Sequence, residues 1–174
     1  CSSDLVTVTL ADERWVATDD AASNEHLLRA AFAGTPAGAA RIVGLKTAGA
    51  TPEAALPEVT RRLAAVPRPF DAVVLGMGDD GHTASLFPDA PDLAAALASP
   101  APVAALHPRS APHARLSLTP AALFDARALY VHIVGDGKRA LLDAALADGP
   151  VTALPIRAAL RHPGPPPCTV HWAP

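Results

Sequence analysis

The feature that most constrains the fold is residues 73–88, VVLGMGDDGHTASLFP, where a short apolar run leads into a glycine-rich turn. The run is β-branched and too short for a helix, so it predicts a central strand buried on both faces. Gly76, Gly78 and Gly81 let the backbone approach a ligand closely. Residues 83–86 are expected to begin a helical turn whose N–H groups face an anion. Because ligands bind beyond the carboxyl ends of strands in open α/β sheets, we expect the active site here.

The polar residues of this stretch indicate a function more strongly as a group than any of them does alone. A Gly-Asp-Asp-Gly run is most often an ordinary turn, since Asp and Gly both favour turns. A single histidine is more often a structural or exposed residue than a catalyst. Here Asp79, Asp80 and His82 follow a predicted strand directly and precede hydroxyl side chains and a proline. This combination indicates a functional turn.

Composition excludes several other classes of protein. The 174 residues are 50% hydrophobic with a formal net charge of -3, which is typical of a single globular domain. No basic run is present to neutralise a nucleic acid backbone, and no apolar stretch is long enough to span a membrane. Cys1 and Cys168 stand at opposite ends of the chain, and no histidines pair at metal-ligand spacing. We therefore expect a cytoplasmic protein with free thiols, no metal and no nucleic acid partner.

Helical and strand patterns alternate along the chain. Apolar runs and alternation predict strands at residues 4–10, 41–43, 70–75, 100–106, 114–120, 128–134 and 169–172. Periodicity and caps predict helices at residues 19–32, 52–65, 92–97, 120–124, 138–147 and 155–160. This order predicts an α/β fold, a mostly parallel sheet with helices on both faces.

Two polar segments and one lysine need separate interpretation. The acidic and basic residues of ADERWV, residues 11–16, favour a solvated turn, although Trp15 makes an ordered loop more plausible than the charges alone suggest. Residues 107–113 read as a plain surface loop in preference to an active-site wall. Lys138 falls in the first turn of a helix, where it opposes the helix dipole, and this placement favours an anion nearby.

The motifs resemble those of a known family. GMGDDGHTASLFP at residues 76–88 is similar to the signature of 6-phosphogluconolactonases, within the glucosamine/galactosamine-6-phosphate isomerase superfamily. ADERWV and DDAASN, within residues 11–24, look like its second signature. RLSLTP, GDGKRALLDAAL and the closing TVHWAP are also similar, so the resemblance covers nearly the whole chain. It implies a Rossmann-like fold of the sugar-phosphate isomerase and lactonase type.

The resemblance also implies a reaction, the hydrolysis of 6-phospho-D-glucono-1,5-lactone in the oxidative pentose phosphate pathway, without metal or organic cofactor. A histidine suits this chemistry, because a lactone carbonyl is electrophilic enough for water activated by a neutral base. We assign that base to His82, with Asp80 either orienting its imidazole or stabilising its cation. The backbone of Gly76 and Gly78 is expected to help bind the oxyanion.

The substrate phosphate calls for cations. By analogy with the superfamily, Arg115 and Lys138 occupy phosphate-binding positions, and Arg14 is expected to line the same pocket. Asp12 matches an acidic position that acts on a carbon proton in the deaminases. A lactonase has no such proton to remove, so we expect Asp12 to bind a substrate hydroxyl.

One departure from the family pattern concerns the N-terminal part. Family members carry a Gly-Gly-Ser-Thr-Pro-type phosphate loop upstream of the strand that precedes the ADERWV segment, and this sequence has none. We therefore expect residues 1–174 to form one lactonase-like domain that lacks this portion, with an uncovered sheet edge that favours self-association. Two other functions remain open, an amino-sugar-phosphate isomerase or deaminase and a non-catalytic sugar-phosphate-binding fragment.

Overall fold

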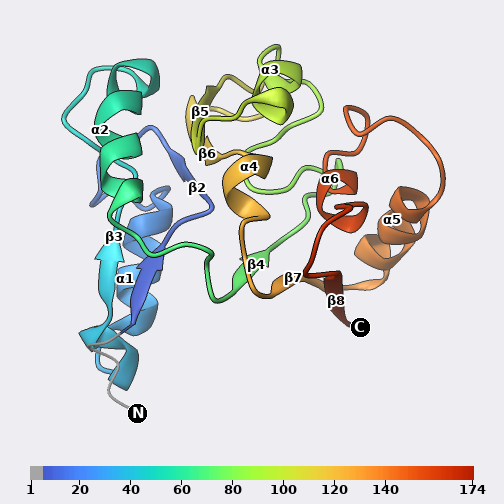
Figure 1. Cartoon of the computed structure of the whole chain (residues 1–174), viewed down its shortest axis with the longest axis horizontal. Coiled ribbons are helices and arrows are strands. Elements are labelled where there is room, and N and C mark those ends of the chain that lie inside the picture. The colour runs from blue at the N-terminus through green and yellow to red at the C-terminus, as the bar shows by residue number, and fades with distance from the viewer. Residues whose placement is uncertain (1–5) are drawn as a thin grey trace.

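The computed structural model describes residues 6–174, in which short strands alternate with helices (Figure 1). The strands of this part are β1 (Thr7–Thr9), β2 (Asp12–Arg14), β3 (Arg41–Val43), β4 (Val73–Leu75), β5 (Val103–Leu106), β6 (Arg115–Leu118), β7 (Leu129–Val134) and β8 (Cys168–Ala173). Its helices are α1 (Asn24–Phe32), the 3-10 helix η2 (Pro36–Ala39), α2 (Pro52–Ala64), α3 (Leu93–Ala98), α4 (Pro120–Leu123), α5 (Asp136–Leu146) and α6 (Arg157–Leu160).

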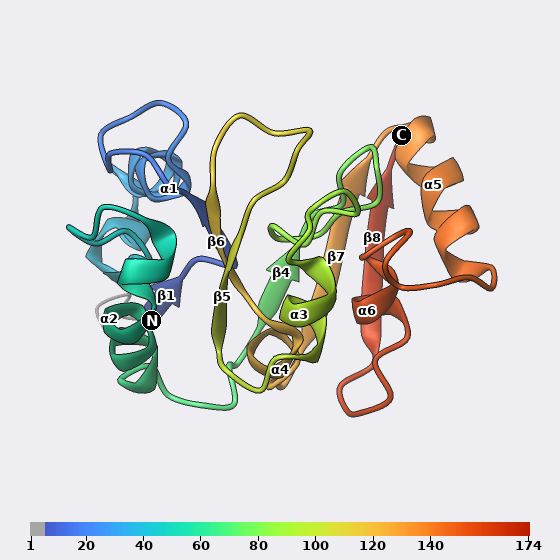
Figure 2. The ribbon, with the colours of Figure 1, turned by 90° about the horizontal axis from the view of Figure 1, so that it is seen from above.

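The strands form three sheets. β1 pairs with β3, and β4, β7 and β8 pair in that order, all in parallel. The α/β prediction with parallel pairing is therefore confirmed for these strands, as is the edge position of β8. The third sheet, β2-β6-β5, is antiparallel and was not predicted. Figure 2 shows α1 and α2 at one end of the molecule and α5 at the other, with β5 and β6 between them.

The strand before the glycine-rich turn differs from the prediction in two ways. Within the described residues β4 pairs with β7 alone, so it lies at the edge of its sheet and not at the centre. Its outer residue Val74 is 64% exposed, while Val73 and Leu75 are buried, so only one face of the strand is covered. β1 lies across a groove of about 430 Å³ that both strands line. An uncovered edge is therefore present, as expected.

Helix α1 is shorter than predicted. It begins at Asn24 because the Ser23 hydroxyl accepts a hydrogen bond from the His26 backbone N–H at 3.1 Å, whereas residues 19–22 form turns. Leu27 was expected to face inward but is 53% exposed, because the buried position of the first turn belongs to Glu25. Helix α2 matches its prediction, with Thr51 as its cap and Pro52 in its first turn.

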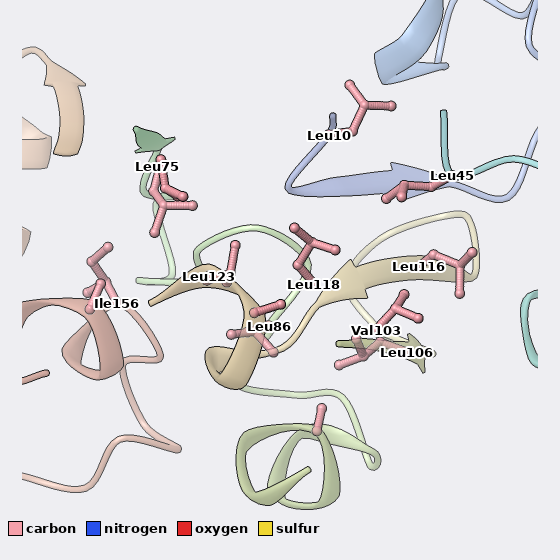
Figure 3. Packing of buried hydrophobic residues seen from close by; sticks show 14 of the residues in the cluster. Leu10, Leu45, Leu75, Leu86, Val103, Leu106, Leu116, Leu118, Leu123 and Ile156 are labelled. Atoms are coloured by element: carbon pink, nitrogen blue, oxygen red, sulfur yellow. The ribbon is translucent and has the colours of Figure 1, made fainter. Parts of the chain in front are cut away.

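Leucines from separate elements form the core that holds the glycine-rich turn (Figure 3). Leu86, within that turn, is fully buried and lies beside Leu118 of β6 and Leu123 of α4. Burying such a side chain contributes about 1.5–3 kcal/mol. The loop is thereby anchored to the antiparallel sheet as well as to β4.

Two observations concern the expectations that composition gave about membrane-spanning segments and free thiols. Among the described residues, no helix combines the length and apolar character that crossing a membrane requires. Cys168 is a free thiol, and burial raises its pKa. The expectation for Cys1 lies outside the described residues.

Candidate active site

A backbone hydrogen bond within the turn after β4 closes that turn. The Gly78 N–H donates to the His82 carbonyl at 2.9 Å, and Gly81 adopts a φ of +79°, which L side chains rarely allow. A Cβ at position 78 would lie 2.1 Å from the His82 ring, so glycine is required there for the imidazole to fit. In this conformation the Gly78 N–H is already used, and contact of the Gly76 and Gly78 backbone with an oxyanion stays a prediction.

Residues 83–86 form a tight turn and not the predicted start of a helix. Thr83 and Leu86 make an isolated bridge, and Ala84 has a φ of 48°, a left-handed conformation that costs a non-glycine residue about 1–2 kcal/mol. The turn directs the Ser85 N–H to the Ser117 hydroxyl at 3.2 Å. The expected helix N-terminus facing an anion is therefore absent from this turn.

Asp80 and His82 form a carboxylate–imidazole pair. Asp80 Oδ1 lies 2.6 Å from His82 Nδ1 and also accepts from the His82 backbone N–H at 3.0 Å. A carboxylate only accepts hydrogen bonds, so Nδ1 carries the ring proton and Nε2 keeps its lone pair. The pair is partly exposed, with side-chain exposures of 37% and 28%. It thus presents a basic nitrogen beside solvent, as general-base catalysis requires.

The antiparallel pairing of β2 with β6 brings three further predicted site residues together, Asp12, Arg14 and Arg115. Its register sets Arg14 opposite Arg115 and Asp12 opposite Ser117. Asp12 Oδ2 accepts from the Ser85 hydroxyl at 2.6 Å, which joins this sheet to the turn that carries His82. Three segments far apart in the sequence therefore meet at one place.

Asp12 is a partly buried carboxyl with polar and cationic neighbours. Burial raises its pKa, while the Ser85 hydrogen bond and the charges of Arg115 and Arg14 oppose that rise. Oδ1 also accepts from Asn24 Nδ2 at 3.2 Å. Both oxygens are held in place, which suits a group that binds a hydroxyl in a fixed position.

Arg14 and Arg115 form a pair of neighbouring cations. Burial and the charge of Arg14 both lower the pKa of Arg115. Arg14 donates to the Ala22 carbonyl at 2.7 Å, but its Nε is buried without a hydrogen-bond partner among the described residues. An anion between the two guanidinium groups would relieve their repulsion and supply an acceptor for that nitrogen.

These groups line one cavity of about 540 Å³. Of the predicted site residues, Asp12, Arg14, Gly76, Gly78, His82 and Arg115 line it, together with Asn24, Ala84 and Phe87. Ser110, Ala111 and Pro112 form part of its wall, so the interpretation of residues 107–113 as a plain surface loop is wrong. Within residues 6–174, no group of three His, Cys, Asp or Glu side chains is placed to hold a metal ion.

Lys138 stands beside the cavity. As expected, it follows a turn at Gly135, whose φ is +96°, and lies in the first turn of α5. Its Nζ donates to the carbonyl of Met77, a lining residue, at 2.6 Å and pairs with Asp79 Oδ1 at 2.7 Å. Lys138 lowers the pKa of Asp79. Phosphate binding by Lys138 stays a prediction.

The interpretation of residues 11–16 as a solvated turn is wrong, because β2 lies there and Glu13 is fully buried. The Glu13 carboxylate accepts from the backbone N–H groups of Arg14 and Asn24, each at 2.7 Å, and of Glu25 at 2.8 Å. It also accepts from the Ser23 hydroxyl at 3.0 Å. Glu13 lies between the site residues Asp12 and Arg14 in β2. It therefore holds the N-terminus of α1 against the strand that carries both of them.

Comparison with known proteins is consistent with this geometry. Residues 1–169 match the family model described as glucosamine-6-phosphate isomerases/6-phosphogluconolactonase. The 6-phosphogluconolactonase of Pseudomonas putida is 44% identical over 171 residues, which are 97% of this chain and 69% of the relative. That of Mesorhizobium japonicum is 45% identical over 173 residues, covering 98% and 71%. The chain belongs to the glucosamine-6-phosphate isomerase/6-phosphogluconolactonase family.

Solved structures of the family show the same fold. The crystal structure of a 6-phosphogluconolactonase from Shewanella baltica OS155 superposes with a TM-score of 0.95 at 42% identity, covering 99% of this chain and 73% of that one. A monomeric glucosamine-6-phosphate deaminase superposes with a TM-score of 0.77 at 17% identity, covering 99% and 74%, a likeness of fold alone. The predicted resemblance and fold class are confirmed.

Three residues of this family member's site were missed by the sequence reasoning. Ser85 holds Asp12, Asn24 holds the other Asp12 oxygen, and the ring of Phe87 stacks on His82. Ser85 and Phe87 lie within the motif that carried the resemblance, where their positions close to His82 were the available signal. Asn24 closes the DDAASN motif, which also carried the resemblance, but its contact with Asp12 depends on how α1 docks against β2.

Proposed function

We propose that this chain hydrolyses 6-phospho-D-glucono-1,5-lactone to 6-phosphogluconate, the second step of the oxidative pentose phosphate pathway, with His82 as the general base. The observation that carries the proposal is the Asp80–His82 pair in a cavity that Arg14 and Arg115 also line. One side of such a site activates water and the other binds a phosphate. The relatives named above carry this activity in their names.

The reaction needs one base that returns its proton. His82 Nε2 accepts a proton from water as the water oxygen bonds to the lactone carbonyl carbon, which becomes tetrahedral with a negative oxygen. The carbon then re-forms its carbonyl, the bond to the ring oxygen breaks, and the imidazolium gives its proton to that oxygen. The carboxylic acid product ionises in solution. Asp80 stabilises the imidazolium during these steps through its 2.6 Å contact with Nδ1.

The remaining site residues bind the substrate in this proposal. Arg14 and Arg115 hold the phosphate, with Lys138 contributing from the rim of the cavity. Asp12 binds a sugar hydroxyl. Each oxygen of its carboxylate already accepts one hydrogen bond, but each has a further lone pair that can accept from the substrate. The Gly76 backbone remains the candidate for contact with the oxyanion.

An amino-sugar-phosphate isomerase or deaminase is the alternative enzyme, favoured by Asp12, which lines the cavity and whose raised pKa suits a proton-transfer group. The two activities are separated by supplying each substrate. We expect acid release from the lactone above the spontaneous rate and no ammonia or ketose from glucosamine 6-phosphate. Ammonia or fructose 6-phosphate without lactone turnover would refute the proposal. Ligand-induced stabilisation without any turnover would indicate a binding fragment.

Two further proposals concern the setting of the protein. We place the reaction in the cytoplasm, because a phosphorylated lactone carries charge that disfavours crossing a bilayer. The uncovered edges of β1 and β4, with Val6 48% and Val74 64% exposed, favour association with a second copy of the chain. Sedimentation that shows a concentration-dependent dimer, weakened by Val74→Lys, would support this association, and a monomer at every concentration would refute it.

A further inference from the structure

The ring of Phe87 lies against the proposed base. Its centroid is 3.9 Å from that of His82, and the two ring planes are 22° apart, which is a stacked arrangement. Phe87 is 7% exposed and lines the cavity. The fully buried Leu86 before it and the hydrogen bond from the Ala90 N–H to its carbonyl, 3.2 Å long, fix its backbone. Phe87 is thus a rigid surface against which the imidazole rests.

This contact adds a constraint that Asp80 does not supply. The hydrogen bond at Nδ1 limits rotation of the His82 ring about its Cβ–Cγ bond, but it contacts neither face of the ring. The flat face of Phe87 fixes the plane of the ring, and the absence of a side chain at Gly78 leaves the space that this plane requires. Together the three residues set the direction in which Nε2 points.

The same aromatic ring also contacts a cation of the cavity. The Arg115 guanidinium carbon lies 5.4 Å from the Phe87 centroid, within the range of a cation–π interaction. A π face attracts positive charge, so it favours the imidazolium that forms when His82 takes a proton. Phe87 therefore lies between the proposed base and the proposed phosphate-binding group.

We propose that Phe87 is a positioning residue for His82, holding the imidazole plane for attack by water and stabilising the imidazolium. This inference rests on the proposed lactonase function. It predicts an effect on kcat more than on KM, because Arg115 keeps its place in β6 and its bond to the His113 carbonyl when the ring is removed.

The kinetic test compares Phe87→Leu, which keeps an apolar side chain but loses the flat face, with Phe87→Tyr, which keeps the ring. We expect Phe87→Leu to lower kcat by about 3- to 10-fold, which corresponds to the stabilisation that an aromatic pair usually contributes. KM should change less than about 2-fold. Phe87→Tyr should recover most of that loss. A kcat for Phe87→Leu equal to that of the wild type, or a loss as large in Phe87→Tyr, would overturn the proposal.

A matched control comes from the pair of Phe124 and His162, whose rings lie 4.7 Å apart at 36° and line no part of the cavity. Phe124→Leu removes a similar ring from a histidine elsewhere in the protein. It should leave kcat unchanged. A drop in kcat equal to that of Phe87→Leu would show that both variants merely loosen the fold, and would overturn the positioning role.

A spectroscopic test does not depend on turnover. A ring stacked at 3.9 Å shifts the imidazole proton resonances upfield, so in the wild-type chain those of His82 should lie upfield of those of the exposed His26. Phe87→Leu should abolish the shift, and Phe124→Leu should not. If the wild type shows no lactonase activity, the proposed function fails while this result still decides the geometry. Resonances of His82 at the position of an unstacked histidine would overturn the inference.

Discussion

Replacing Glu13 by glutamine converts one of two acceptor oxygens at the N-terminus of α1 into a donor. The best orientation turns the new amide toward the Ser23 hydroxyl, which can rotate to accept, but it leaves the Glu25 N–H without the acceptor it has at 2.8 Å. An orphaned buried donor costs about 1–3 kcal/mol. Loss of a negative charge at a helix N-terminus costs about 0.3–1 kcal/mol. We therefore expect Glu13→Gln to lower the free energy of unfolding by about 1.3–4 kcal/mol.

Urea denaturation followed by circular dichroism measures this change. Glu13→Ala, which removes both oxygens, should cost more, about 3–5 kcal/mol. The matched control is Glu58→Gln, which removes the charge from a partly exposed ion pair with Arg62 on α2 and should cost less than about 1 kcal/mol. A loss in Glu13→Gln no larger than in Glu58→Gln would refute the view that Glu13 anchors α1 to the site.

Three further predictions concern the site. Asp80→Asn removes a charge-assisted hydrogen bond from a partly exposed pair, worth about 1–2 kcal/mol, so kcat should fall about 5- to 30-fold; an unchanged kcat would exclude Asp80 from orienting His82. Burial raises the pKa of Asp12, so the folded state holds the proton more strongly than the unfolded state, and wild-type stability falls as pH rises from the ordinary carboxyl value of 3.8 toward the folded value. Asp12→Asn lacks this dependence, so its stability relative to the wild type should increase as the pH rises above about 3.8, and a constant difference in urea titrations would contradict the reasoning. Asp79→Asn frees Lys138 and should lower KM for the lactone, whereas Lys138→Ala should raise it; equal KM values in all three proteins would show that Lys138 does not hold the phosphate.

Local patterns in the sequence predicted most elements. Helix caps, proline positions and apolar runs are short-range signals, which is why α2, β3 and β7 were found close to their true limits. The turn at Gly135 before α5 was likewise readable, because only glycine readily adopts its positive φ. These features depend on neighbours a few residues away.

Burial and strand order depended on distant partners and were not predictable in the same way. Val74 reads as a core residue of a central strand, yet it is exposed because no other element of the described chain covers its face of β4, whereas Val73 and Leu75 on the other face are buried. Glu13 reads as a solvated charge, yet it is buried because the N-terminus of α1 supplies its hydrogen bonds. In both cases the environment comes from another part of the fold.

The candidate site likewise combines features that local sequence patterns predict with features that depend on distant parts of the chain. The pairing of Asp80 with His82 lies within three residues and was predicted. Arg14 lies opposite Arg115 because of the antiparallel register of β2 and β6, which no local pattern encodes. The family resemblance nevertheless placed both residues in one pocket. The tight turn at Ala84 was missed because a left-handed alanine is rare, and residues 83–86 were expected to begin a helical turn.

The measurement that tests the central claim most directly is the rate of lactone hydrolysis by the wild-type chain and by His82→Ala, each corrected for the spontaneous reaction. Circular dichroism confirms that the variant keeps its fold. With His82 as the general base, the wild type should exceed the spontaneous rate, and the variant should lose about 10²- to 10⁴-fold in kcat. A folded His82→Ala protein that hydrolyses the lactone as fast as the wild type would contradict the account.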